Sequence, residues 1–91
     1  HVHLKDTDLV PNEVAIAGVL DNRPFEDPTH RAWGFRTIGR GHGPEFWSGF
    51  VAALREVGYD DTLSIENEDE FQPAEPGVRE AAAFMLPLLR A

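Results

Sequence analysis

The first six residues alternate between polar and apolar side chains. Because successive side chains of a strand point to opposite faces, this alternation predicts a β-strand over residues 1–6. Imidazoles and an ammonium are costly to bury without partners, so the polar face is either solvated or turned toward a ligand. The polar face carries His1, His3 and Lys5, and the apolar face carries Val2 and Leu4.

Apolar residues recur at helical spacing between residues 44 and 57. They are Phe46, Trp47, Phe50, Val51, Leu54 and Val57. Pro44 suits the first helical position and Glu45 the first turn, while Gly58 can supply a left-handed cap after the last turn. The pattern predicts a helix over 44–57.

The C-terminal third repeats the order of strand and helix. Alternation over residues 62–66 predicts a second strand, with Glu66 on its polar face. A final helix is predicted over 76–90, beginning near Pro76, and Pro87 is expected to kink or fray its last turn. The residues between these elements, Asn67, Glu68 and Asp69 among them, are expected to form a solvated acidic loop.

The stretch 7–43 contains the glycines and prolines typical of a long loop, and no regular element is predicted in it. Its apolar run over residues 14–20 is too short to be assigned to helix or strand from its period. Three aromatic residues within it, Phe25, Trp33 and Phe35, indicate that the loop packs against the rest of the chain.

The predicted order is two β/α units, and two such units form a parallel strand pair with helices packed outside. Ligands in this architecture bind at the carboxyl ends of the strands. His3 and Lys5 lie near the end of the first strand and Glu66 ends the second. We therefore expect these side chains to meet over one site.

Net charge and amino-acid composition limit the partners and the kinds of metal site that the protein can have. The 91 residues carry a formal charge of −8, which disfavours a nucleic-acid partner. No cysteine is present, so a metal would need imidazole and carboxylate ligands. No segment is long and apolar enough to predict a membrane span, and no signal pattern is visible, so we expect a cytoplasmic protein without a membrane partner.

Four segments together resemble the C-terminal part of a sugar phosphate isomerase/epimerase of the xylose-isomerase-like TIM-barrel superfamily. The resemblance covers nearly the whole chain, although residues 10–35 match less clearly and look like an enlarged loop. The segments are His1-Val2-His3-Leu4-Lys5-Asp6, Gly39-Arg40-Gly41-His42-Gly43 leading into Phe46-Trp47, Gly58-Tyr59, and Leu63-Ser64-Ile65-Glu66-Asn67-Glu68-Asp69.

The resemblance implies a fold class and a metal site. The fold would be α/β, namely the C-terminal β/α units of a TIM (β/α)8 barrel, with about two strands and two helices and incomplete as given. It implies a divalent ion, Mn, Mg, Co or Zn, bound by His3 from the seventh strand and Glu66 from the eighth. Two further carboxylate ligands would come from earlier strands, which would precede His1. The resemblance also makes Glu66 the acid/base residue.

The remaining candidates are substrate contacts, each with a plain alternative. His1 either shapes the site or is a frayed terminus, and Lys5 either contacts substrate or is a salt-bridge partner. The glycine-rich segment 39–43 before a helix resembles an anion cradle for a phosphate, although such glycines also serve tight turns. Within it, Arg40 and His42 are the candidate ligand contacts.

Three functions follow as hypotheses. The first is a metal-dependent sugar or sugar-phosphate isomerase or epimerase, which moves a proton between adjacent sugar carbons. The second is an endonuclease-like metal hydrolase of the same superfamily, which the acidic balance disfavours. The third is a non-catalytic fragment, or an assembly or binding module. A two-stranded parallel pair exposes both edges, so we expect self-association or association with the missing part of the barrel, and an inactive fragment without it.

Overall fold

The computed structural model, which describes all 91 residues, contains two separate two-stranded sheets, and both strands of the second lie in the sequence between the two strands of the first. Together with three α-helices they make a small mixed α/β domain. The elements are β1 (Val2–Leu4), β2 (Asp6–Leu9), α1 (Pro11–Ala17), the 3-10 turn η1 (Pro28–His30), β3 (Trp33–Arg36), α2 (Pro44–Glu56), β4 (Leu63–Ile65) and α3 (Ala74–Arg90).

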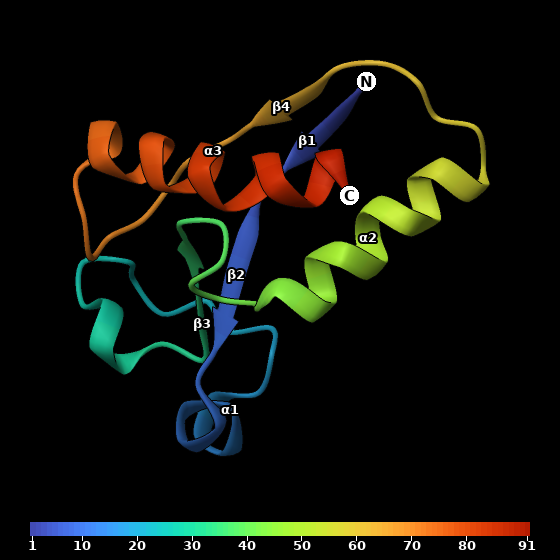
Figure 1. Cartoon of the computed structure of the whole chain (residues 1–91). Coiled ribbons are helices and arrows are strands. Elements are labelled where there is room, and N and C mark those ends of the chain that lie inside the picture. The colour runs from blue at the N-terminus through green and yellow to red at the C-terminus, as the bar shows by residue number, and fades with distance from the viewer.

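The first sheet pairs β1 with β4 in parallel, as the sequence predicts. His3 lies opposite Ser64, and the backbone N–H of Glu66 donates to the carbonyl of Leu4 at 2.9 Å, which extends the pairing past β4. Parallel strands need a long crossover, and here it includes α2 (Figure 1). The ends of both strands therefore point the same way, toward Lys5 and Glu66.

The second sheet corrects the prediction of a loop over 7–43. β2 and β3 pair antiparallel, with Thr7 opposite Phe35 and Leu9 opposite Trp33. The predicted strand over 1–6 is likewise wrong in its extent, because it is divided at Lys5 into β1 and the start of β2. Each of these short strands pairs with a segment far away in the sequence, and a local pattern does not reveal such a pairing.

The helix α1 also lies where the sequence predicted irregular structure. Pro11 occupies the first turn, and Gly18, with φ of +71°, ends the helix by donating its N–H to the carbonyl of Val14. None of the seven helical residues is buried. Local capping signals therefore define α1, and its apolar side chains contribute little to the core.

The two long helices agree with the sequence except at their ends. α2 spans Pro44–Glu56, and Gly58 follows it with φ of +77°. α3 begins at Ala74, before the predicted start, and continues past Pro87 to Arg90. The last turn is held because Leu88 and Leu89 pack against the core and the Arg55 side chain donates to the carbonyls of Leu89 and Ala91.

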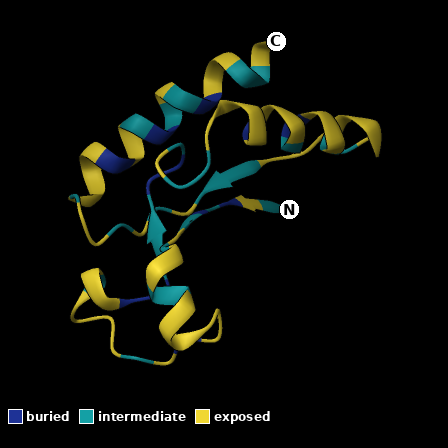
Figure 2. Cartoon of the chain, turned by 90° about the horizontal axis from the view of Figure 1, so that it is seen from below, coloured by how far each residue is buried: buried dark blue, intermediate teal, exposed yellow.

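The core lies between the β1–β4 sheet and the two long helices. Only 12 of 91 residues are buried, so this core is small, and much of α1 and of the outer helix faces is exposed (Figure 2). The opposite face of the sheet carries the polar side chains of β1 and β4. The buried cluster consists of Leu4, Ile38, Trp47, Val51, Ala81 and Met85, with Leu63 and Ile65 packed against it. None of the helices has the length and apolar character needed to cross a membrane.

Candidate functional site

His3 and Glu66 meet on the polar face of the β1–β4 sheet. Nδ1 of His3 lies 3.1 Å from Oε1 of Glu66, and the two side chains are 55% and 44% exposed. The contact follows from the parallel register, because the N–H of Glu66 bonds the carbonyl of Leu4, the residue after His3. The predicted meeting of these two side chains is confirmed, while their roles as metal ligands and acid/base group stay predictions.

Lys5 extends this group toward the loop after β4. Its Nζ lies 2.8 Å from Oε1 of Glu68 and 3.9 Å from Oε2 of Glu66. The same ammonium lies 4.0 Å from the centre of the Phe35 ring, in cation–π geometry. The ammonium is thus held between two carboxylates and an aromatic face contributed by β3.

His1 lies on the same polar face, two residues before His3. Its Nε2 is 2.6 Å from Oγ of Ser64, and its ring packs edge-on against the ring of His3 with centroids 5.3 Å apart. The structure therefore brings four predicted site residues together: His1, His3, Lys5 and Glu66. They form what we call the polar strand face.

The polar strand face fits part of a metal site. Two ligand atoms that each lie about 2.1 Å from a metal ion, at right angles to one another, are about 3 Å apart. His3 Nδ1 and Glu66 Oε1 have a similar separation of 3.1 Å. No group of three or more His, Asp or Glu side chains in the chain is arranged to hold a metal ion. Residues 1–91 thus offer two ligand positions, and further protein ligands would have to come from outside them.

The glycine-rich segment 39–43 binds an anion, but that anion is the carboxylate of Asp6. The backbone N–H groups of Gly39, Gly41 and His42 donate to Asp6 Oδ2 at 2.9, 3.2 and 3.0 Å. The N–H of Thr7 donates to Oδ1 at 2.8 Å. The interpretation of this segment as a phosphate cradle is therefore corrected, because the N–H groups already have an internal acceptor.

The Asp6 side chain is fully buried, yet it is held as an anion. Burial by itself raises the pKa of this carboxyl, but the hydrogen bonds from the backbone and ring of His42, and from Gly39 and Thr7, outweigh burial and lower the pKa below its usual value. Nδ1 of His42 lies 2.7 Å from Oδ1, and Nε1 of Trp47 lies 3.4 Å from Oδ2. His42 is thus a partner of Asp6.

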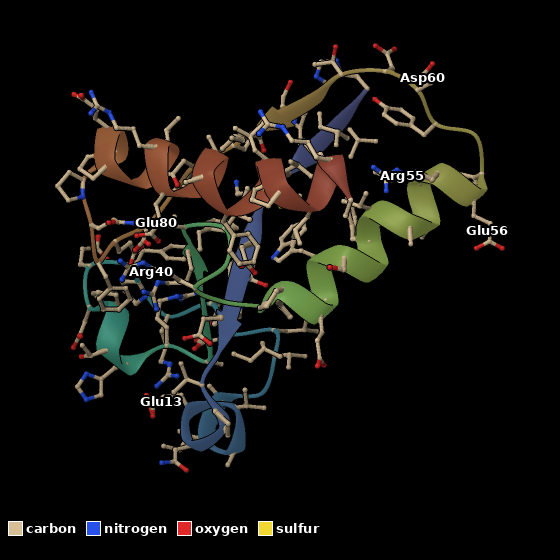
Figure 3. All side chains as sticks on the ribbon, in the orientation of Figure 1. Glu13, Arg40, Arg55, Glu56, Asp60 and Glu80 are labelled. Carbon is tan, nitrogen blue, oxygen red and sulfur yellow. The ribbon has the colours of Figure 1, made fainter.

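Arg40 points away from the polar strand face and toward α3. Its Nε and Nη2 donate to the two carboxylate oxygens of Glu80 at 2.5 and 2.8 Å, and the two side chains face one another in Figure 3. The side-chain hydrogen bond from Arg40 lowers the pKa of Glu80. Arg40 and His42, predicted as substrate contacts, are therefore not joined to His3 and Glu66.

The prediction of a solvated acidic loop after β4 is wrong for Asp69, whose side chain is buried. Its buried carboxylate accepts from the N–H and Oγ1 of Thr37 at 2.9 and 2.8 Å, and from the N–H of Phe71. Burial raises the pKa of Asp69, but these bonds and the nearby charge of Arg36 lower it overall. Asp69 thereby ties the loop after β4 to the end of β3.

Asp6 and Asp69 are structural residues that sequence reasoning missed. The sequence does contain a signal that Asp6 is buried. Asp6 lies two residues after Leu4, so in an extended segment both side chains point to the same face, which is the face that packs against the helices. An acid on a buried face needs donors, and the N–H groups of a glycine-rich segment are suitable ones. No comparable local signal marks Asp69.

The aromatic residues of the predicted loop do pack together. The Phe25, Trp33 and Phe35 rings have centroids 5.2 to 6.3 Å apart, and the buried guanidinium of Arg31 lies 3.8 Å from the Phe25 centroid. A small pocket opens beside β3. Its lining includes Asp8, Trp33, Phe35, Arg36, Glu70 and Phe71.

The sequence is similar to part of a longer bacterial protein. Over 79 aligned positions, which are 87% of this chain, the sequence is 33% identical to "Uncharacterized protein YfiH" of Bacillus subtilis (strain 168). The chain spans only 25% of the length of that relative. No family model matches the sequence.

Proposed function

We propose that residues 1–91 form the last two β/α units of a xylose-isomerase-like TIM barrel, and that the complete protein is a metal-dependent sugar isomerase or epimerase. The observation that carries this proposal is the contact between His3 and Glu66, 3.1 Å apart across neighbouring parallel strands at their carboxyl ends. Active sites of β/α barrels are built at that end of the strands.

The two faces of the β1–β4 sheet support the barrel interpretation. Apolar side chains such as Leu4 and Ile65 face α2 and α3, as strands of a barrel face their outer helices. The opposite face carries polar side chains, and β1 and β4 each pair on one edge alone. Further strands would satisfy those free edges and enclose the polar strand face.

The length of the relative is consistent with this proposal. A complete barrel has eight β/α units in roughly 250 residues, of which two are a quarter. The chain likewise spans a quarter of the matched Bacillus protein. The proposed remainder of the barrel would also supply the carboxylate ligands that complete the metal site.

The chain's own residues have distinct roles in the proposed reaction. His3 Nδ1 and Glu66 would hold the divalent ion, which when bound supplies polarisation of a sugar carbonyl or hydroxyl. In an isomerisation, Glu66 would take a proton from one sugar carbon and return it to the adjacent one, while the hydroxyl proton of the first carbon moves to the carbonyl oxygen of the second. Its side chain is 44% exposed on the polar strand face, so a bound sugar can reach it.

Lys5 would orient the Glu66 carboxylate and contact substrate oxygens. Its Nζ lies 3.9 Å from Oε2 of Glu66, the oxygen that does not face His3. Glu68 holds the ammonium at 2.8 Å from the other side. The two oxygens of Glu66 thus face different partners, which fixes the plane of the carboxylate.

Turnover by the complete protein tests the proposal. We expect isomerisation or epimerisation of a sugar in the presence of Mn²⁺ or Mg²⁺, and a loss of at least ~10³-fold in kcat for Glu66→Gln. Glu56→Gln is the matched control, because it removes the same charge from an exposed position at the end of α2 (Figure 3). Full activity of Glu66→Gln would rule out the role of this residue.

A further inference from the structure

The segment that contains α1 has charged side chains inside and apolar side chains outside. No residue of α1 is buried, and Ile16 near its end is 74% exposed. In the turn after the helix, Val19 is 57% exposed and Leu20 is 93% exposed. Figure 2 shows that most of this helix and its turn face solvent. We call Ile16, Val19 and Leu20 the α1 surface.

The interior of the same segment is held together by charged groups. The Asp21 side chain is 1% exposed and accepts from Nη2 of Arg23 at 2.7 Å, while Nη1 of Arg23 lies 3.4 Å from Oε1 of Glu13. Arg31 is also buried, and its guanidinium donates to the carbonyls of Arg23 and Asp21 and lies on the Phe25 ring. Two acids and two cations therefore balance one another inside, and the apolar side chains of α1 have no core to join.

The α1 surface carries no charge, although 26% of the residues in the chain are charged. Residues 14–20 contain no Asp, Glu, Lys or Arg. The acids on either side of this stretch, Glu13 and Asp21, both pair with Arg23. Two copies can therefore meet through the α1 surface without opposing like charges, whereas the formal charge of −8 disfavours contacts through charged faces.

The α1 surface is separate from the edges at which further strands would pair. β1 and β4 each have one free edge. In Figure 1, these two strands lie at one end of the domain, and α1 lies beyond the far end of β2. The proposed barrel would therefore be completed at a different part of the domain.

We propose that the α1 surface joins two copies of the protein in a symmetric dimer. In an isologous contact the same patch lies on both sides, so each apolar side chain is removed from water on both copies. An uncharged apolar surface complements itself, which makes a second copy the occupant that fits its chemistry. A nucleic acid or an anionic membrane would instead be repelled by the formal charge of −8. The proposal does not depend on the isomerase function.

Sedimentation velocity of the complete protein at micromolar concentrations tests the proposal. We expect a dimer of the unmodified protein. The double variant Ile16→Glu, Leu20→Glu should associate at least ~100-fold more weakly, because each copy then brings two like charges into the contact. Val57→Glu is the matched control, since Val57 is 79% exposed at the end of α2, and it should dimerise as the unmodified protein does.

Three results would overturn the proposal. They are a monomeric unmodified protein, a double variant that dimerises normally, and a Val57→Glu variant that loses the dimer equally. Circular dichroism checks the folding of each variant. If the double variant is unfolded, Leu20→Gln decides in its place, because it removes one apolar side chain without adding a charge. We expect at least ~10-fold weaker association for it, and unchanged association would overturn the proposal.

Discussion

Nδ1 of His42 lies 2.7 Å from Oδ1 of Asp6, and the backbone N–H of the same histidine donates to both oxygens of that carboxylate. This pair joins the residue at the start of β2 to the loop that begins α2, 36 positions later. Because Asp6 follows Lys5 directly, the pair also fixes the carboxyl end of β1. The stability of the fold and the geometry of the polar strand face therefore depend on one buried carboxylate.

Asp6→Asn should reduce the free energy of unfolding by about 2–4 kcal/mol, because an amide cannot accept from all the N–H groups that surround this buried position. The measurement is urea unfolding followed by circular dichroism. The control is Asp8→Asn, whose partly exposed carboxylate lies 3.7 Å from Arg36 and should change the value by less than about 0.5 kcal/mol. Equal effects of the two substitutions would contradict the account of Asp6.

Gly41→Ala should destabilise the protein by about 2 kcal/mol or more, because a Cβ there would overlap the carbonyl oxygen of Thr7 and crowd Asp6. Gly43→Ala is the matched control in the same segment, since a Cβ at that position meets nothing within 4 Å. Thermal unfolding of both variants gives the comparison. A Gly41→Ala variant as stable as Gly43→Ala would show that the loop does not pack on Asp6.

Acid should destabilise the fold through Asp6 and Asp69. Hydrogen bonds outweigh burial at both residues and lower their folded-state pKa values below the ordinary 3.8. Their ionised forms therefore stabilise the fold above the unfolded-state pKa, and this stabilisation is lost as the pH falls through the folded-state pKa. We expect little change near neutral pH and a decline below about pH 4. An unchanged decline in the double variant Asp6→Asn, Asp69→Asn would assign the effect to other groups.

Arg40→Gln should leave turnover and the metal affinity of the complete protein unchanged, because Arg40 bonds Glu80 on α3. The pair is partly exposed, so its loss should have little effect on unfolding. Steady-state kinetics of the variant gives the test. A rise in KM of tenfold or more would restore Arg40 as a substrate contact, as the sequence suggested.

The features that the sequence predicted depend on local periodicity. The spacing of residues such as Trp47 and Val51 predicts α2, and the alternation around His3 and Glu66 predicts the parallel pair and the meeting of these side chains. The antiparallel pairing of β2 with β3 depends instead on contacts between distant residues, such as Thr7 with Phe35. Polar β2 residues and a glycine in β3 also hide both strands from a hydrophobicity pattern.

The polar network of the site was predicted only in part. The glycine-rich segment 39–43 was expected to bind an anion, and it does, but the anion is Asp6. A sequence shows that donors are available, whereas the fold decides which acceptor reaches them. Asp69 is a second example. The sequence predicts it in a solvated loop, whereas in the structure its carboxylate is buried and accepts hydrogen bonds from Thr37.

Mn²⁺ titration of the complete protein by calorimetry tests the central claim, that His3 and Glu66 hold a metal ion, most directly. We predict saturable binding that weakens at least ~100-fold in His3→Gln and in Glu66→Gln, while Glu56→Gln binds as the unmodified protein does. Unchanged affinity in both His3→Gln and Glu66→Gln would contradict the claim.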